Sequence, residues 1–148
     1  MIFAPRKTHR ITGSWETLVY YEDTDFSGFV YHANYLKFFE RAREHLIGID
    51  YLRALFRDGL HFVVRKLDAE FLAPAGHGDR ITIATECEFS NSPLLQFVQT
   101  ASRSSGANSP SVECVRAKIE VVFIDSKGKP HRLSRDVLAH LTHGITQN

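Results

Sequence analysis

The chain has 148 residues, of which 43% are hydrophobic and 24% are charged, and its net charge is +1. This length suits one globular unit with its own hydrophobic core, so we expect residues 1–148 to form a single domain. A net charge near zero, without a basic run, argues against nucleic acid as a partner. Because no segment is long and uncharged enough for a membrane span, we expect a cytoplasmic protein.

The first two predicted elements are a strand and a long helix. Residues 11–22 are rich in β-branched and aromatic side chains, which predicts the strand. Residues 23–28, Asp-Thr-Asp-Phe-Ser-Gly, have the composition of a tight turn. Apolar residues then recur at spacings of three and four, which predicts a helix over residues 33–49. The members of this apolar stripe are Tyr31, Tyr35, Phe38, Phe39, Ala42, Leu46 and Ile49.

The rest of the chain is predicted to be mostly strands. Residues 51–60 are expected to form an irregular connection that can include a short helical turn, before strands over residues 62–73, 80–89, 94–102 and 112–124. Successive strands are separated by turns and should pair antiparallel. A short helix is expected over residues 133–141, with His140 and His143 in a solvated tail. The order β-α-β-β-β-β-α predicts an α+β fold of one sheet and one long helix.

Alternation within the strands indicates which side chains face the core. In residues 80–89 the less polar residues Ile81, Ile83, Thr85 and Cys87 share one face. The second cysteine, Cys114, also falls in a predicted strand, so both cysteines are expected to be buried free thiols.

The junction between the first strand and the helix carries two acids, a glycine and a histidine. A carboxylate beside a helix N-terminus places a base or nucleophile next to oriented backbone N–H groups. Hydrolysis of an activated acyl group needs those two parts. Asp23 and Asp25 could equally be turn and capping residues. The four residues at this junction are Asp23, Asp25, Gly28 and His32.

Metal and cofactor sites are not expected. Residues 23–34 fit the opening positions of an EF-hand loop, but Asn34 stands where a bidentate glutamate is required. The segment before this loop is also predicted to be a strand rather than a helix. The sequence has no phosphate loop, dinucleotide fingerprint or Gly-x-Ser-x-Gly motif, so no cofactor is expected.

Residues 21–35, Tyr-Glu-Asp-Thr-Asp-Phe-Ser-Gly-Phe-Val-Tyr-His-Ala-Asn-Tyr, resemble the signature of the 4-hydroxybenzoyl-CoA thioesterase family. Residues 39–43, Phe-Glu-Arg-Ala-Arg, continue that likeness. Within the family, the sequence is most similar to the Tol–Pal-associated acyl-CoA thioesterases. Residues 62–66, 73–75 and 128–130 also resemble this subgroup.

The resemblance implies a hot-dog fold, in which an antiparallel sheet wraps around the long helix, and a homodimer or homotetramer with sites at subunit interfaces. It implies hydrolysis of acyl-CoA to free acid and coenzyme A, with Asp25 as nucleophile or general base. The backbone N–H of His32 would polarise the thioester carbonyl, and the His32 side chain and Tyr21 would complete the catalytic site. Gly28 and Tyr31 would contact the substrate.

Several points stay open at this stage. A non-enzymatic protein that binds acyl-CoA or a partner through the same fold is the alternative function. Glu40 is expected to form an ion pair with Arg41 or Arg43. The acyl group of the substrate and the choice between dimer and tetramer are not predicted. The cations considered for the coenzyme A phosphates are Arg65, Lys66, Arg80, Arg103 and Arg116.

Overall fold

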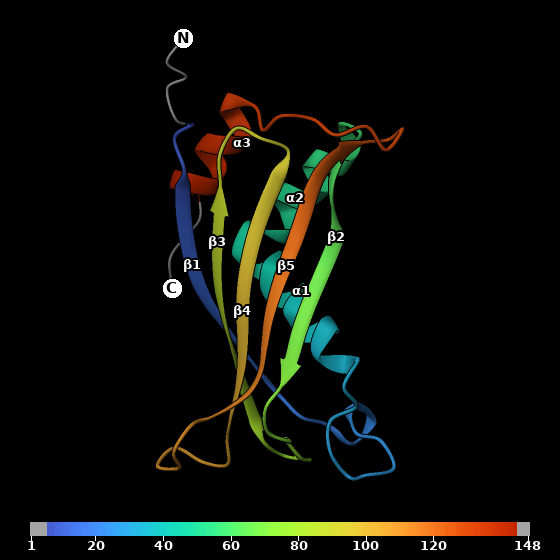
Figure 1. Cartoon of the computed structure of the whole chain (residues 1–148), viewed down its shortest axis with the longest axis vertical. Helices are drawn as coiled ribbons and strands as arrows, with labels where there is room; N and C mark the ends of the chain where they lie inside the picture. The colour runs from blue at the N-terminus through green and yellow to red at the C-terminus, as the bar shows by residue number, and fades with distance from the viewer. Residues whose placement is uncertain (1–5, 145–148) are drawn as a thin grey trace.

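The computed structural model describes residues 6–144, and Figure 1 shows a curved sheet with one long helix lying across it. The strands are β1 (His9–Leu18), β2 (Leu60–Phe71), β3 (Arg80–Phe89), β4 (Leu94–Ser104) and β5 (Val112–Asp125). The helices are α1 (Asn34–Ile47), α2 (Ile49–Arg57) and α3 (Arg135–Ala139). A 3-10 turn, η1 (Tyr21–Asp23), precedes α1, and a π-helical turn, η2 (His140–Gly144), follows α3.

Every pair of neighbouring strands in the sheet is antiparallel, and the strand order is β1-β3-β4-β5-β2. The predicted pairing of β3 with β4 is confirmed, with Arg80 opposite Ser104. The expectation that β2 pairs with β3 is wrong, since β2 lies at the sheet edge, where Leu60 faces Asp125 of β5. The connection between β2 and β3, residues 72–79, is too long for a tight hairpin turn and crosses the end of the sheet.

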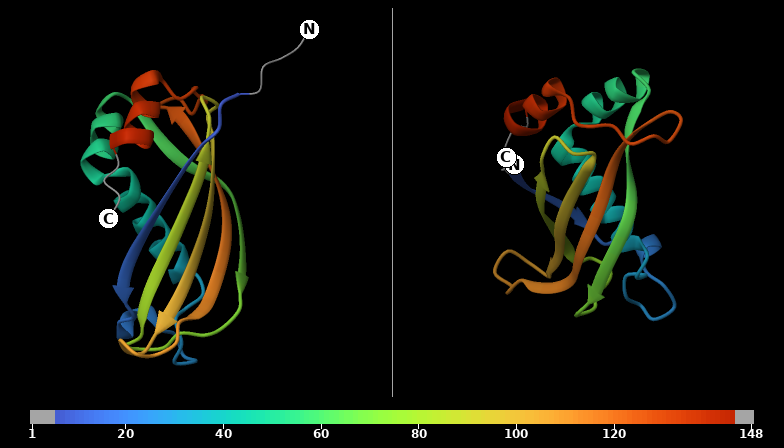
Figure 2. Two further views of the ribbon diagram at one scale, coloured as in Figure 1. Left: turned by 90° about the vertical axis from the view of Figure 1, so that its left-hand side faces the viewer. Right: turned by 45° about the horizontal axis from the view of Figure 1, so that its top comes forward.

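Helix α1 lies against the concave face of the sheet, which curves around it (Figure 2). The predicted apolar stripe is confirmed along the middle of the helix, because its central members are buried there. Tyr31 and Ile49 fall outside α1 and are partly exposed. Arg43, which is not a member of the predicted apolar stripe, is buried as well. The buried residues of α1 are Tyr35, Phe38, Phe39, Ala42, Arg43 and Ile47.

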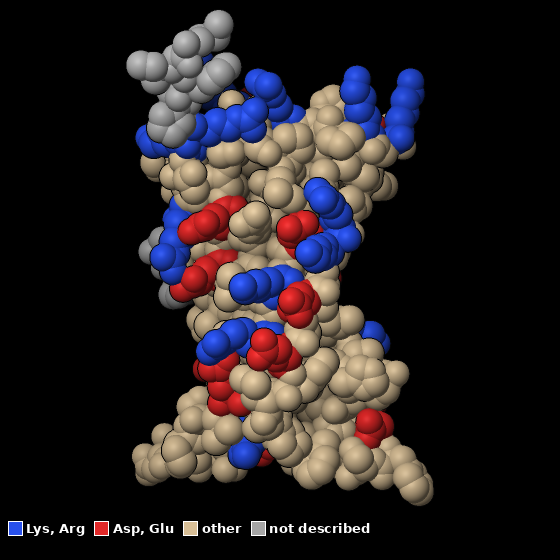
Figure 3. Space-filling view, viewed as in Figure 1, with Lys and Arg blue, Asp and Glu red and all other residues tan. Residues whose placement is uncertain are grey.

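The two faces of the sheet differ as the period-two pattern predicts. In β3 the alternation is confirmed, since Ile81, Ile83, Thr85 and Cys87 are all buried. The outward face carries alternating acidic and basic side chains (Figure 3). Among their ion pairs are Arg10–Glu86 at 2.6 Å and Arg80–Glu16 at 3.4 Å. Both cysteines, Cys87 and Cys114, are buried free thiols, as expected.

Strand β1 ends earlier than the sequence indicated. It stops at Leu18 rather than at residue 22 because Val19 leaves the ladder and bonds the loop before β3. The N–H of Val19 donates to the carbonyl of Asp79 at 2.9 Å, and the carbonyl of Val19 accepts from Gly78 at 2.9 Å. The aromatic residues that suggested a longer strand lie in and beside η1 instead.

The connection over residues 51–60 is more regular than expected, because most of it belongs to helix α2, which is longer than a short helical turn. Gly48 separates the two helices with a φ of +106°, a conformation that favours glycine and changes the chain direction. Leu52 and Phe56 follow at helical spacing, which is the signal that the sequence-based prediction missed. No helix within residues 6–144 is long and apolar enough to cross a membrane.

The C-terminal segment packs against the end of α1. The Nε2 atom of His140 lies 2.7 Å from the carbonyl oxygen of Ile47, and its ring stacks on Tyr51 with centroids 3.5 Å apart. The expectation that His140 is solvated is therefore wrong, although His143 is exposed. Of the segment expected to be a tail, residues 145–148 lie outside the described residues.

The burial of α1 predicts a difference between two truncations on the same helix. Phe39 is 0% exposed and Leu36 is 39% exposed. Phe39→Ala leaves a cavity in the core and should lower the free energy of unfolding by about 3–5 kcal/mol, whereas Leu36→Ala should cost much less. Urea unfolding at one protein concentration measures both. Equal losses would contradict the position of α1 on the sheet.

Candidate active site

The loop after η1 closes into the turn that the sequence predicted. The N–H of Gly28 donates to the carbonyl of Asp25 at 3.0 Å, and the N–H of Asp25 donates to the carbonyl of Phe29 at 3.0 Å. Gly28 has a φ of +85°, and a Cβ atom there would meet no described atom within 4 Å. The turn therefore requires glycine for its backbone conformation and not for close packing.

Hydrogen bonds fix this loop to the start of α1. The backbone carbonyl of Asp23 accepts from the N–H of Tyr31 at 2.9 Å and from Nδ2 of Asn34 at 2.8 Å. On its other side, the N–H of Val30 donates to the carbonyl of Ala75 at 2.8 Å. These bonds hold the segment between Asp23 and Tyr31 at the amino-terminal end of the helix.

Asp25 presents an ionised carboxylate with one oxygen available. Its Oδ1 atom accepts from the N–H of Ser27 at 2.8 Å and from the Ser27 hydroxyl at 2.5 Å. Within residues 6–144, no hydrogen bond reaches Oδ2 of Asp25. The hydroxyl and N–H of Ser27 are the main reasons why the pKa of Asp25 is lowered, and the nearby His32 contributes further. Asp25 is exposed in the single chain.

Two backbone N–H groups beside this loop have no hydrogen-bond partner among the described residues. Helix α1 begins at Asn34, two residues after the expected catalytic amide of His32, and no side chain within residues 6–144 caps its N-terminus at Ala33. In the described part of the chain, the N–H groups of His32 and Ala33 make no hydrogen bond. Unsatisfied N–H groups at a helix start, aided by the helix dipole, stabilise negative charge.

A cavity of about 290 Å³ opens next to these donors. The His32 ring forms part of its wall, stacked obliquely on Tyr31 at 4.6 Å and edge-on to Phe71 at 6.0 Å between ring centroids. Burial raises the pKa of the Tyr35 phenol, which keeps it neutral. The residues that line the cavity are Phe29, Val30, His32, Tyr35, Phe71, Leu72, Ala73 and Pro74.

The structure brings some of the expected site residues together and separates one. Asp25 and His32 lie within electrostatic range of each other, Gly28 shapes the turn between them, and Tyr31 packs on the His32 ring. Tyr21 is 82% exposed and lies edge-on to the ring of His77, at 6.4 Å. It does not line the cavity.

Sequence reasoning missed part of the cavity wall. Ser27, the main partner of Asp25, stood within the recognised stretch without a role. Phe71–Pro74 supply the opposite wall, from the end of β2 and the loop after it. Ala73 and Pro74 fall within residues 73–75, which resemble the thioesterase subgroup, but no local pattern places this wall beside the loop, because the fold brings it there from far along the chain.

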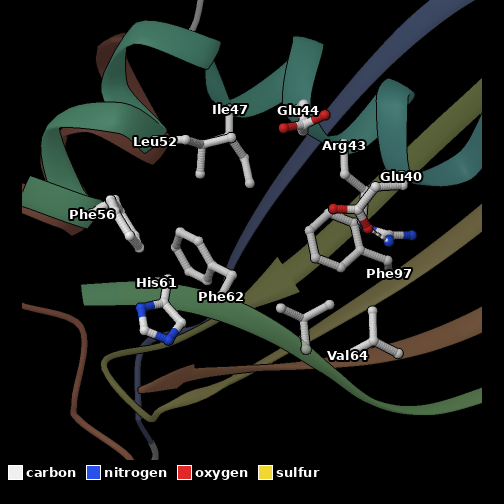
Figure 4. A pocket seen from close by; sticks show the side chains of 11 residues that line it. Glu40, Arg43, Glu44, Ile47, Leu52, Phe56, His61, Phe62, Val64 and Phe97 are labelled. Carbon is white, nitrogen blue, oxygen red and sulfur yellow. Dashed lines mark hydrogen bonds and ion pairs between the residues drawn. The ribbon is translucent and has the colours of Figure 1, made fainter. Parts of the chain in front are cut away.

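A second cavity, of about 240 Å³, lies between α1, α2 and the start of β2 (Figure 4). It is largely aromatic and aliphatic, with the Glu40–Arg43 pair on one side. This ion pair confirms the expected partner of Glu40. Since Asp25 and His32 do not line this cavity, the first cavity is the one that suits the chemistry of the loop.

Several of the cations considered for phosphate binding already form ion pairs with glutamates. Arg65, Arg80 and Arg116 lie 3.8, 3.4 and 2.9 Å from glutamate carboxylates. Arg103 is partly buried, and its Nε atom has no hydrogen-bond partner among the described residues. Lys66 is exposed. Three of the five candidate cations are therefore paired with carboxylates.

The model of one protein family, the thioesterase-like superfamily, matches residues 19–141. The chain belongs to this superfamily. This thioesterase-like chain is 37% identical over 128 residues to a protein of Escherichia coli O6:H1 named acyl-CoA thioester hydrolase YbgC. The match covers 84% of this chain and 92% of that relative.

Solved structures agree with this assignment. A probable thioesterase from Bartonella henselae is 36% identical, with a TM-score of 0.65, over 83% of this chain and 98% of that one. The 4-hydroxybenzoyl-CoA thioesterase from Pseudomonas sp. strain CBS-3 is 18% identical, with a TM-score of 0.75, over 86% and 96% of the two chains. The expected hot-dog fold of this thioesterase-like chain is confirmed.

The contacts of Asp25 predict how its pKa responds to one substitution. Because the Ser27 hydroxyl stabilises the charged form, Ser27→Ala should raise the pKa of Asp25 toward the ordinary aspartate value. An NMR titration of carboxyl carbons measures this change. Asp125, whose pKa is lowered mainly by His131, is an internal control and should not move. An unchanged Asp25 pKa in Ser27→Ala would contradict the geometry of the turn.

Proposed function

We propose that this chain hydrolyses acyl-CoA thioesters to free acid and coenzyme A. The observation that carries the proposal is the loop with the Asp25 carboxylate, which hydrogen bonds close onto the start of α1, where the N–H groups of His32 and Ala33 have no partner among the described residues. A carboxylate next to oriented N–H donors can attack a carbonyl carbon itself, or it can activate a water molecule that attacks. The donors stabilise the negative charge that develops on the carbonyl oxygen. The similarity to a relative named acyl-CoA thioester hydrolase supports the same activity.

The lowered pKa of Asp25 keeps its carboxylate charged at neutral pH, which both the nucleophilic and the general-base forms of the mechanism require. In the nucleophilic form, the free oxygen of Asp25 attacks the thioester carbon. The coenzyme A thiolate then leaves, and water hydrolyses the resulting mixed anhydride. The N–H of His32 stabilises the oxyanion in each tetrahedral intermediate.

The remaining site residues have supporting roles in this proposal. Tyr31 packs on the His32 ring and fixes its orientation, and Gly28 allows the turn that presents Asp25. The cavity lined by Phe29, Tyr35 and Phe71 then receives part of the substrate. The side chain of Tyr21 is exposed beside the loop and would meet the substrate from solvent.

We further propose that the chain folds as one domain and works in the cytoplasm as a homodimer or homotetramer. Strand β2 is an edge strand, and it carries exposed apolar side chains along its length. Open edges of this kind pair readily with a second copy. The exposed apolar residues of β2 are Val63, Val64, Leu67 and Phe71.

Release of free thiol from a panel of acyl-CoA esters tests the activity. The wild-type chain should turn over at least one short aliphatic, long aliphatic or aromatic thioester. Asp25→Asn should fold normally and lose at least about a hundredfold in kcat, because the amide can neither attack nor accept a proton. Asp58→Asn, on an exposed residue after α2, is the matched control and should retain activity.

Two outcomes of this assay would contradict the proposal. Near wild-type turnover in Asp25→Asn would remove Asp25 from the mechanism. Binding of acyl-CoA without turnover of any thioester in the panel would instead support a non-enzymatic acyl-CoA-binding protein.

Light scattering tests the assembly. The purified chain should have two or four times the mass of one chain, because pairing satisfies the open edge of β2 and covers its apolar side chains. A mass of one chain at micromolar concentration would contradict this part of the proposal.

A further inference from the structure

Most contacts between the sheet and α1 are apolar, but one buried polar residue of the sheet forms hydrogen bonds with the helix. Gln99 of β4 is 0% exposed and lies directly opposite Thr85 of β3. Its Nε2 atom donates to the backbone carbonyl of Phe39 at 3.1 Å and to the Thr85 hydroxyl at 2.9 Å. Its Oε1 atom accepts from Nη1 of Arg43 at 2.9 Å. Gln99 therefore bonds α1 at both a backbone and a side-chain position.

The Arg43 end of this network is fixed as well. Its guanidinium group forms an ion pair with Glu40 and lies over the ring of Phe97, 5.8 Å from the centroid. Arg43 is 7% exposed, so its charge depends on these partners. Both hydrogen atoms and the oxygen of the Gln99 amide are used, which leaves this buried group satisfied.

Apolar contacts and hydrogen bonds constrain a helix in different ways. Burial of apolar area is non-directional, so the apolar side chains of α1 favour contact with the sheet without fixing where along its axis the helix lies. Hydrogen bonds have strict distances and angles. In the described residues, the bonds of Gln99 to Phe39 and Arg43 are the hydrogen bonds that join α1 to side chains of the sheet.

We infer that Gln99 is a positioning residue for thioester hydrolysis, an inference that rests on the proposed thioesterase function. By fixing the axial position of α1, Gln99 places the first turn of the helix against the loop that carries Asp25. Phe39 lies six residues after Ala33, which is about 9 Å along the helix axis. A shift of the helix at Phe39 therefore strains the bond from Asn34 to the Asp23 carbonyl, and with it the position of the N–H groups of His32 and Ala33 relative to the carboxylate.

The test compares two glutamine-to-leucine substitutions on the same strand. Gln99→Leu removes the bonds to α1, whereas Gln96→Leu changes an exposed glutamine on β4. Gln99→Leu should lower kcat at least tenfold and leave KM within twofold. A thioether analogue of acyl-CoA, which lacks the carbonyl, should bind both variants and the wild type with the same affinity. The backbone ¹⁵N resonances of His32 and Ala33 should shift in Gln99→Leu only.

A second variant covers the case in which Gln99→Leu does not fold. Gln99→Met is unbranched and of similar length, so it fills the same space without the hydrogen bonds. It should show the same fall in kcat and the same resonance shifts. Normal kcat with unmoved amide resonances in either folded variant would overturn the inference. A loss of affinity for the thioether analogue as large as the loss in kcat would also overturn the inference, since that result would indicate a role of Gln99 in binding.

The proposed function and this inference fail in different ways. If the wild-type chain releases no thiol from any acyl-CoA ester, the proposed function fails, and the amide resonances alone still show whether Gln99 positions the first turn of α1. If the wild type is active and Gln99→Leu matches it, only the inference about Gln99 fails.

Discussion

The candidate site depends on the hydrogen bonds that the backbone carbonyl of Asp23 accepts. This carbonyl accepts one hydrogen bond from the N–H of Tyr31 and another from the side chain of Asn34, in the first turn of α1. These two bonds close the loop that contains Asp25 onto the helix whose first donors are free. Without this closure, only the turn around Gly28 and the bond from Val30 to Ala75 would hold the carboxylate near the donors.

The electrostatics of the site follow from that closure. Ser27 occupies one oxygen of Asp25 and lowers its pKa, which leaves the other oxygen charged and unoccupied by the described residues. The loop is exposed in the single chain, where water weakens every charge interaction. Bound substrate, or a second copy paired through β2, would exclude water and strengthen the effect of the N–H donors on a developing oxyanion.

Patterns over a few neighbouring residues predicted the elements whose structure depends on neighbouring residues. The alternation in β3 and the helical stripe of α1 arise from burial of one face, so both could be recognised from the sequence alone. The turn around Gly28 was also predicted, because its chemistry lies within a few residues. In the same way, Asp25 and His32 were recognisable as a pair, since the elements that carry them are adjacent in the chain.

The sequence did not predict the features that depend on distant contacts. Strand β2 lies beside β5 at the sheet edge because it pairs with a strand that is distant in the sequence. This pairing also brings residues 71–74 to the wall of the cavity. The contact of His140 with the end of α1 likewise joins residues far apart in sequence. Arg43 was left out of the predicted apolar stripe because its buried partner, Gln99, lies on a strand far along the chain.

In the proposed mechanism, the N–H groups before α1 polarise the carbonyl that Asp25 attacks. Isotope-edited infrared spectroscopy of Asp25→Asn with an acyl-CoA carrying a ¹³C-labelled thioester carbonyl measures this polarisation in a bound substrate that is not consumed. We expect the carbonyl stretch to move to lower frequency than in water, because the donors lengthen the C=O bond. A bound carbonyl stretch at or above its frequency in water would contradict the proposed mechanism.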